Sequence, residues 1–270
     1  LYLKLKEVKT PDGNDFLYKA DYQGMYCVGC ESFKTEDDLV DGKCPDHQTE
    51  PVEHKETNWF FRISDYENDL KRKINSGELV IQPESKQKEV MGLLDQGLKD
   101  VAVSRQNLKW GIELPFDQEQ VSYVWIEALM NYISALGGPE DDLFKKFWPA
   151  NVHLMAKDIL KFHAVIWPIM LIALGLELPE KIYAHGYFTI DGQKMSKTIG
   201  NVIAPAELAE KYGVDAAKFL LLNQFHFGND GDISLANLDE MYNNVLGNDL
   251  GNLVSRVLSM TEKYFEGRVP

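Results

Sequence analysis

The segment 185–203, HGYFTIDGQKMSKTIGNVI, combines glycines with two closely spaced lysines. Lys194 and Lys197 stand on either side of Met195 and Ser196. An ammonium group is a compact charge with three donors, which suits it to bind a phosphate chain. Two such groups on a glycine-bounded loop can close over a polyphosphate as charge develops on it. A solvated surface loop is the plainer interpretation of the same spacing.

A second candidate site is a C-x2-C motif followed, after 13 residues, by a C-x2-H motif. The four side chains are Cys27, Cys30, Cys44 and His47. Four such ligands make a closed tetrahedral zinc site with no open position, so the zinc would be structural. Scattered buried cysteines are the alternative, yet every cysteine of the chain falls in this constellation. Gly29 and Gly42 are expected to supply the unusual backbone angles of the turns.

Two segments predict helix faces suited to a ligand pocket. In VWIEALMNY, one face holds the residues at i, i+3, i+4 and i+7. They are Trp125, Ala128, Leu129 and Tyr132. In KDILKFHAVIW, Asp158 shares a face with Phe162, and His163 shares a face with Ile159. A core stripe explains the first face equally well, and a lone histidine is most often a satisfied core residue.

The positions of Asp158 and Gly186 relative to two predicted strands point to a ligand crevice. Asp158 follows the strand NVHLMA, at the end where a parallel sheet places its ligands. Its plainer role is to cap the next helix. Gly186 interrupts the strand KIYAHGYFTI, where it permits close approach of a flat ligand to the backbone.

Composition sets limits on the class of protein. The 270 residues are 44% hydrophobic, which is sufficient for a packed core. A net charge of −14 argues against a general nucleic-acid binder, although an RNA could bind through a local patch. No uncharged apolar run approaches the length of a membrane span. Three cysteines without a secretory signal predict a reducing compartment.

The elements that position these residues are predicted from periodicity and glycine stops. Residues 1–56 are predicted to form short strands and turns, and residues 57–120 to mix loops with helices that end at Gly77 and Gly97. Residues 121–192 alternate helix, strand, helix and strand, with a kink expected at Pro168. That order is typical of half of a parallel α/β sheet. A loop and then helices complete the chain.

Several segments together resemble one enzyme family. KMSKT resembles the KMSKS signature of class I aminoacyl-tRNA synthetases, with Thr198 retaining a hydroxyl in place of the last serine. YVWIEALMNYI, MAKDILKFHAVIWPIML, the lysine loop and DLGNLVSR are together similar to bacterial methionyl-tRNA synthetases. YCVGC and GKCPDH resemble the zinc knuckle in the connective insertion of that family. Leu129 stands where some members carry proline, a departure that could reshape the pocket floor.

This resemblance implies roles for individual residues. The methionine pocket would be lined by Trp125, Ala128, Tyr132, Phe162 and His163. The ATP site would comprise Lys157, Asp158, Gly186, Phe188, Lys194, Ser196 and Lys197. Asp158 would hold the ribose, Gly186 and Phe188 would border the adenine, and the two loop lysines would act in catalysis by neutralising the phosphates. The implied reaction is ATP- and magnesium-dependent activation of methionine, followed by transfer to tRNA(Met), in the cytoplasm.

The fold implied by the resemblance is α/β, the second half of a Rossmann-like catalytic domain. The connective insertion would occupy residues 1–120, with its zinc knuckle in residues 1–56. The second half of the catalytic domain would follow in residues 121–192. The lysine loop and stem-contact helices would span residues 193–247, and an anticodon-binding helical segment would begin at residue 248.

The second signature of the family, a HIGH-type tetrapeptide, has no match among the six histidines. We therefore expect the N-terminal half of the nucleotide-binding fold to be a missing partner of this segment, and the segment alone to be inactive. Two alternatives stay open at this point. One is a class I synthetase for another amino acid, and the other is a synthetase-like binding or regulatory module.

Overall fold

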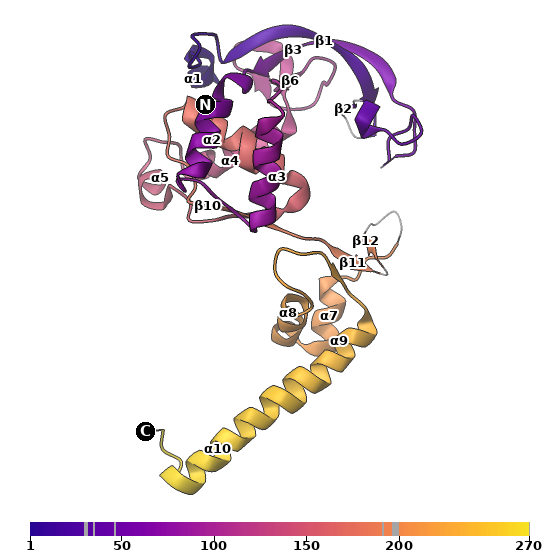
Figure 1. Ribbon diagram of the computed structural model, residues 1–270, viewed down its shortest axis with the longest axis vertical. Coiled ribbons are helices and arrows are strands. Elements are labelled where there is room, and N and C mark those ends of the chain that lie inside the picture. Colours follow the sequence, from indigo (N-terminus) through magenta and orange to yellow (C-terminus); the bar gives the residue numbers. More distant parts are fainter. Residues whose placement is uncertain (30–31, 35, 46, 191, 196–199, 270) are drawn as a thin grey trace. The chain divides into compact units, whose positions relative to one another are not determined.

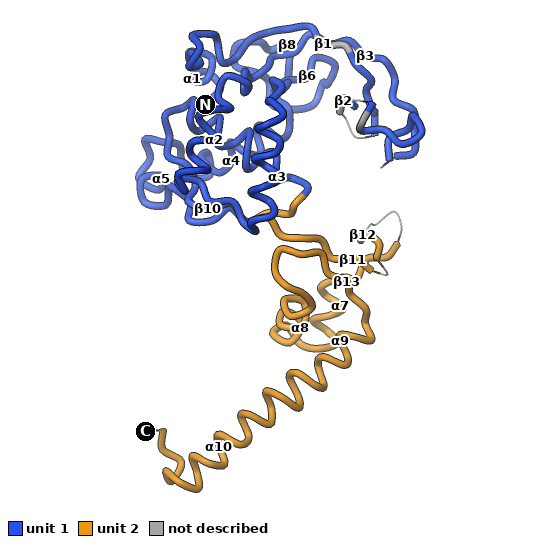
Figure 2. The backbone as a smooth tube through the Cα atoms, viewed as in Figure 1, with its two compact units in different colours: residues 1–153, 158–183 blue, residues 154–157, 184–270 orange. Residues whose placement is uncertain are grey.

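The computed structural model describes residues 1–29, 32–34, 36–45, 47–190, 192–195 and 200–269. The chain divides into two compact units, shown in Figure 2. Unit 1 comprises residues 1–153 and 158–183, and unit 2 comprises residues 154–157 and 184–270. Across the described ranges, we find no helix with the length and apolar character needed to cross a membrane. The five-part division drawn from the sequence stays a prediction.

A long antiparallel hairpin of β1 (Leu17–Cys27) and β3 (Val52–Phe61) forms the arch at the top of Figure 1. Together with β2 (Ser32–Lys34) and β5 (Val101–Ala102) it makes a sheet of order β2-β1-β3-β5. The prediction of only short strands in residues 1–56 was wrong. Strand length here depends on pairing between segments far apart in the chain, and a local pattern does not reveal that pairing.

Three helices of unit 1 confirm the sequence predictions. They are α2 (Glu67–Asn75), α3 (Glu84–Asp95) and α4 (Val124–Ser134). Each is followed by a glycine with positive φ: Gly77 (78°), Gly97 (87°) and Gly137 (80°). A left-handed residue ends a helix because its backbone turns the chain away from the axis, and glycine adopts that conformation without a steric penalty. The remaining helical elements of this region are α1 (Tyr2–Glu7), α5 (Asp142–Phe147) and the 3-10 turns Glu36–Asp38 and Ser64–Tyr66.

The strands β4 (Val80–Gln82) and β10 (Lys181–His185) pair in parallel, and Ile182 lies opposite Ile81. Both isoleucines are buried, as expected for strands covered on their faces. The strand predicted at NVHLMA is present as β9 (His153–Ala156). The prediction of only helix and loop in residues 57–120 missed β4. It also missed a small sheet of order β6-β8-β7, made by β6 (Ser104–Arg105), β8 (Asp117–Ser122) and β7 (Glu113–Leu114).

The helix predicted from Asp158 onward is divided into three segments. A 3-10 turn (Lys157–Ile159) is followed by the π-helical segment η4 (Phe162–Ile166) and then by α6 (Trp167–Ala173). Pro168 lies in the first turn of α6, where its missing N–H costs little. Instead of the kink expected at Pro168, the helix changes from π-helical to α-helical just before this residue. The π-helical turn contains Phe162 and His163. Such π turns often occur at functional sites.

Unit 2 contains three short strands and a group of helices. The strands are β11 (Phe188–Ile190), β12 (Gln193–Lys194) and β13 (Gly231–Asp232), in the order β12-β11-β13. The helices are α7 (Pro205–Tyr212), α8 (Val214–Leu222) and α9 (Leu235–Met241), and η5 (Tyr242–Leu250) and α10 (Gly251–Phe265) extend α9 as the long rod of Figure 1. The core consists of Leu208, Tyr212, Ala217, Leu220, Ile233 and Leu238.

The strand predicted from Lys181 to Ile190 is interrupted at Gly186, so that β10 and β11 belong to different sheets. A Cβ atom at Gly186 would overlap the backbone of Asn229 and Asp230. Glycine is thus required at this position by the close approach of the chain's own backbone.

Candidate active site and metal centre

The predicted pocket residues of α4 and η4 meet in unit 1. The rings of Trp125 and Phe162 are stacked, with centroids 4.5 Å apart and planes inclined by 17°. Both side chains are half-buried, so each keeps part of its ring surface open. The two residues come from segments that the sequence could not place together. Their contact brings the two predicted helix faces into one site.

Tyr132 and His163 form the polar end of the same site. The His163 Nδ1 atom lies 3.0 Å from the Ile159 carbonyl oxygen, and its Nε2 atom lies 2.9 Å from the Tyr132 hydroxyl. Since a carbonyl only accepts, Nδ1 donates, and in the neutral ring Nε2 then accepts the Tyr132 hydroxyl proton. Burial lowers the pKa of His163 and raises the pKa of Tyr132. Both groups are therefore held neutral, in one orientation.

The α4 face predicted from the sequence separates into a site side and a core side. Ala128 is exposed, between the half-buried Trp125 and Tyr132 along the helix. Leu129 is 1% exposed and belongs to the core. The alternative of a core stripe thus holds for Leu129. The short side chain of Ala128 leaves space between the two aromatic rings.

His153 is a residue of this region that the sequence reasoning missed. Its ring lies 4.2 Å from the ring of Tyr132, and its Nε2 atom accepts a hydrogen bond from Trp167 Nε1 at 3.2 Å. Burial, with a smaller contribution from His163, lowers the pKa of His153 to about 4. His153 therefore supports Tyr132 as a neutral ring. The available signal was its place in β9, where it alternates with the exposed Leu154. We refer to the aromatic cluster as Trp125, Tyr132, His153, Phe162, His163 and Trp167.

The structure places the predicted ATP-site residues in both units. Asp158 is an exposed residue of unit 1. Lys157 belongs to unit 2, where its Nζ atom lies 2.5 Å from Asp230 Oδ2 and 4.8 Å from the ring centroid of Tyr187. Phe188, 38% exposed, packs edge-on against Phe225 with centroids 5.3 Å apart.

The lysine loop follows a hairpin of β11 and β12. Thr189 pairs with Lys194, and Ile190 pairs with Gln193. Met195 packs against the core of unit 2 directly after the hairpin. Ser196 and Lys197, and the side chain of Lys194, lie outside the described part of the structure. Their predicted contacts with phosphate stay predictions.

Three of the four predicted metal ligands converge in unit 1. The Sγ atoms of Cys27 and Cys44 lie 3.9 Å and 3.8 Å from His47 Nδ1, and the three ligand atoms lie within 4.8 Å of one another. Zinc–sulfur and zinc–nitrogen bonds of normal length at a tetrahedral angle give a separation of about 3.6 Å. The described ligands thus fit a metal of this type. The fourth, Cys30, lies outside the described residues.

Of the two glycines of the knuckle, only Gly42 has the predicted role. Gly42 has the expected left-handed conformation (φ 75°), in a two-residue turn between Val40 and Lys43. Gly29 does not have a positive φ. A Cβ at Gly29 would instead overlap the imidazole ring of His47, so the prediction of an unusual backbone angle there was wrong. Glycine is needed at this position because the ligand ring lies directly against the backbone.

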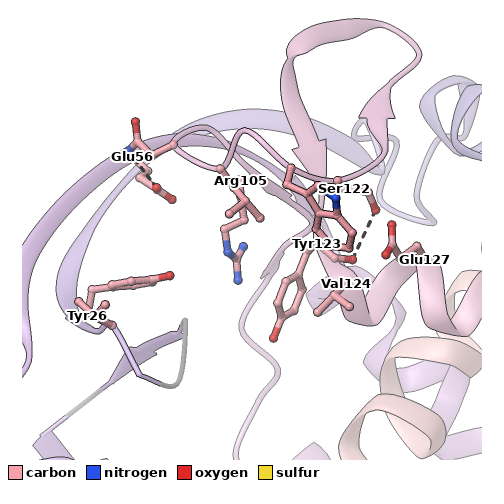
Figure 3. A pocket seen from close by; sticks show the side chains of 12 residues that line it. Tyr26, Glu56, Arg105, Ser122, Tyr123, Val124 and Glu127 are labelled. Carbon is pink, nitrogen blue, oxygen red and sulfur yellow. Dashed lines mark hydrogen bonds between the residues drawn. The ribbon is translucent and has the colours of Figure 1, made fainter.

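Unit 1 also contains a cavity of about 420 Å³ that no predicted site residue lines (Figure 3). The guanidinium group of Arg105 lies 4.0 Å from the ring centroid of Tyr123, and Trp110 at the rim is 85% exposed. Glu127 also lines the cavity, and its Oε2 atom is buried without a hydrogen-bond partner within the described ranges. Val124 and Glu127 immediately precede Trp125 and Ala128, so α4 presents one side to this cavity and another to the aromatic cluster.

Comparisons with known proteins agree on one family. The model of the family "tRNA synthetases class I (M)" matches residues 47–258. A methionine–tRNA ligase of Caldanaerobacter subterraneus is 51% identical over 94% of this chain and 40% of its own length. A methionine–tRNA ligase of Clostridium acetobutylicum is 46% identical over 98% of this chain and 42% of its own length.

Solved structures give the same result. The methionyl-tRNA synthetase of Mycobacterium tuberculosis in complex with methionyl-adenylate superposes with a TM-score of 0.87 at 38% identity, over 100% of this chain and 53% of that chain. The predicted α/β synthetase fold is confirmed by this likeness. The chain thus spans about half or less of the length of the proteins that it matches.

Proposed function

Because the chain belongs to the family of class I tRNA synthetases (M), we propose that the full-length protein activates methionine with ATP and transfers it to tRNA(Met). The activity is proposed for the full-length protein, since the chain spans 40% of the length of the Caldanaerobacter relative. The joint arrangement of Trp125, Phe162, Tyr132 and His163 in unit 1 is the observation that carries this proposal.

The aromatic cluster suits a methionine side chain. A thioether is unbranched and polarizable, and sulfur makes favourable contacts with aromatic rings. The stacked rings of Trp125 and Phe162 would form one wall, and Ala128 would leave room for the side chain. Because His163 is neutral and bound at both ring nitrogens, it offers no charge to attract an acidic side chain. The site would therefore favour a neutral, apolar substrate over a polar one.

The proposed first reaction is an adenylation. A methionine carboxylate oxygen attacks the α-phosphorus of ATP, the bond from that phosphorus to the bridging oxygen breaks, and pyrophosphate leaves with that oxygen. No protein nucleophile is needed, so catalysis rests on alignment and on charge stabilisation. Lys194 and Lys197 would stabilise the charge on the phosphates, with Ser196 beside them, and magnesium would supply further positive charge.

The ATP molecule would be held by the residues predicted from the sequence. Asp158 would bind the ribose, while Gly186 and Phe188 would border the adenine. Lys157 would serve the same nucleotide, and its pairing with Asp230 limits its rotamers. We further propose that the enzyme works in the cytoplasm, where the cysteines would be reduced.

A structural zinc ion in the knuckle is part of the same proposal. Cys27, Cys30, Cys44 and His47 would hold it. The support is the convergence of the three described ligand atoms within 4.8 Å of one another. Two of them belong to buried cysteines, and soft thiolates with imidazole are the ligands that zinc prefers.

Methionine-dependent exchange of pyrophosphate into ATP by the full-length protein tests the proposal. We expect exchange with methionine and little with leucine or isoleucine. Trp125→Ala removes one wall of the pocket and should raise the KM for methionine by at least about 10-fold. Trp110→Ala is the matched control, because Trp110 is a largely exposed tryptophan of the same unit, and it should change that KM less than about twofold. Exchange that is equal for several amino acids, or absent, would contradict the proposal.

A further inference from the structure

We propose that Asp232 is a positioning residue for the lysine loop: its carboxylate fixes the turn of the β11–β12 hairpin from which the loop departs. This inference rests on the proposed function, because the loop acts on ATP only if the protein is the enzyme described above. All of the contacts that carry it lie within unit 2 and among its described residues.

One oxygen atom of Asp232 binds both sides of the turn. Oδ1 accepts a hydrogen bond from the Thr189 hydroxyl and another from the Gly192 backbone N–H, each at 2.8 Å. Thr189 lies on β11, and Gly192 lies in the turn, with φ of 73°. A left-handed glycine turn has several accessible geometries, and a hydrogen bond to its N–H selects one of them.

Asp232 is itself held on both sides along the chain. Gly231 is packed so closely under the Phe225 ring that a Cβ atom there would overlap it. Ile233 is 1% exposed in the core of unit 2, and its N–H donates to the Thr189 carbonyl oxygen at 2.8 Å. The backbone on either side of Asp232 therefore has little freedom. A carboxylate on such a segment is a fixed reference point for the hairpin.

The segments flanking the loop are attached to the same core. Met195 follows β12, Ile203 follows the loop, and both pack against the core of unit 2. These two contacts fix where the loop starts and ends. They do not fix the orientation of β12 (Gln193–Lys194), which pairs only with β11 in its sheet. The turn at Gly192 sets that orientation, and Asp232 holds the turn.

The expected consequence is catalytic rather than structural. Asp232 is exposed, so its hydrogen bonds contribute little to overall stability. A lysine that must meet a developing charge is sensitive to displacement, since an error of about 1 Å can cost about 100-fold in rate. Loss of the Asp232 contacts should thus lower kcat, while the KM for methionine, which depends on unit 1, should stay unchanged.

The test compares four variants of the full-length protein in methionine-dependent pyrophosphate exchange. We expect Asp232→Ala to lower kcat by about 10- to 100-fold, with the KM for methionine within about twofold. Asp232→Asn keeps an oxygen in the Oδ1 position and should retain kcat within about threefold. Thr189→Val removes one of the two hydrogen-bond donors to Asp232. Its kcat should lie between the values for Asp232→Ala and Asp232→Asn.

Asp239→Ala is the matched control. Asp239 is an acidic residue of the same unit that also accepts two side-chain hydrogen bonds, from Lys211 at 2.9 Å and from Tyr212 at 2.7 Å. It lies on α9, away from the hairpin in the chain, and its loss should change kcat by less than about twofold. Equal losses in Asp232→Ala and Asp239→Ala would overturn the inference, because they would indicate a general effect on unit 2.

Equilibrium binding of methionine without ATP completes the design. Asp232→Ala should bind methionine as the unchanged protein does. A variant that loses this binding, or whose defect lies in the KM for methionine, contradicts a local role in positioning the loop. An active unchanged protein with an equally active Asp232→Ala variant would refute only this inference. An unchanged protein without methionine-dependent exchange would refute the proposed function.

Discussion

The knuckle (residues 27–48) and the aromatic cluster lie in the same unit but are stabilised in different ways. In the cluster, the rings of Tyr132 and His153 pack against each other, and Nε2 of His153 and both ring nitrogens of His163 are hydrogen-bonded. In the knuckle, Cys27 and Cys44 are buried, while Val28 is 70% exposed and Val40 is 61% exposed. The cluster can form by burial of apolar surface, whereas in the knuckle the candidate ligand His47 is exposed, as are Val28 and Val40.

This difference bears on the zinc ion proposed for the knuckle. Binding of a structural zinc ion contributes directly to folding, so the proposed ion would stabilise the knuckle. The cluster has ring packing of its own, because Tyr132, His153 and His163 contact one another. The following experiments perturb one region while the other serves as the internal reference.

The largest effect is expected from Cys44→Ala. This change removes a fully buried cysteine from the proposed zinc site, and structural zinc sites in peptides have binding free energies of about 10–16 kcal/mol. We expect stoichiometric zinc in the unchanged protein, almost none in the variant, and new protease cleavage within the knuckle. Elemental analysis and limited proteolysis measure these outcomes. The near-ultraviolet circular dichroism of the aromatic cluster should persist.

Glu50→Gln is the control for that experiment, since Glu50 is exposed and follows the knuckle directly. It should retain the metal. Full zinc occupancy in Cys44→Ala, or a collapse of the aromatic signal together with the knuckle, would remove the distinction between the two regions.

The second effect concerns the pH dependence of stability through His153. Its pKa is lowered from the ordinary 6.5 to about 4 by burial. The unfolded chain therefore binds more protons than the native protein between these values, and stability falls as pH drops from about 6.5 to about 4. The shift corresponds to about 3 kcal/mol. Urea unfolding at pH 7 and at pH 4.5 measures the loss.

His153→Gln should remove most of this dependence, because glutamine does not titrate and its oxygen can still accept the Trp167 N–H. The comparison with the unchanged protein separates this contribution from the pH dependence of the rest of the chain, which both proteins share. An identical loss of stability in the two proteins would show that His153 is not the group responsible.

Sequence reasoning succeeded here where a local rule sets the outcome. The stops of α2, α3 and α4 follow from glycines that adopt positive φ, and the metal ligands follow from cysteine and histidine spacing. The two aromatic faces follow from helical periodicity, but their contact between Trp125 and Phe162 required the fold.

The rest depended on contacts between distant segments. The length of the β1–β3 hairpin arises from pairing across an intervening segment. The roles of Gly29 and Gly186 arise from the ring of His47 and the backbone of Asn229. His153 is not part of any recognisable sequence motif. Its role is to pack against Tyr132, and that contact depends on the fold. Such features can be recognised only once the fold has brought each residue next to its contact in a distant segment.

The third effect separates the two glycines of the knuckle. Gly29→Ala places a methyl group against the His47 ring, and displacement of a metal ligand typically costs about 10- to 100-fold in metal affinity. Gly42→Ala meets no atom within 4 Å and should cost only about 1 kcal/mol of backbone strain, with a smaller loss of affinity. Competition with a zinc chelator measures both. Equal affinities in the two variants would mean that the close approach at Gly29 does not position His47.

The smallest effect is expected from Tyr132→Phe, which keeps the ring of the aromatic cluster and removes only the hydroxyl that donates to His163. A hydrogen bond of this kind contributes about 1 kcal/mol, so the KM for methionine should rise by about 5-fold with kcat nearly unchanged. Tyr212→Phe is the matched control, because it removes a hydroxyl bound to Asp239 in unit 2 and should leave that KM unchanged. If both variants raise it equally, orientation of His163 by Tyr132 does not contribute to methionine binding. If neither variant raises the KM, the stacked rings of Trp125 and Phe162 are sufficient for methionine binding. The hydrogen bond between Tyr132 and His163 then adds nothing to the burial of the ligand.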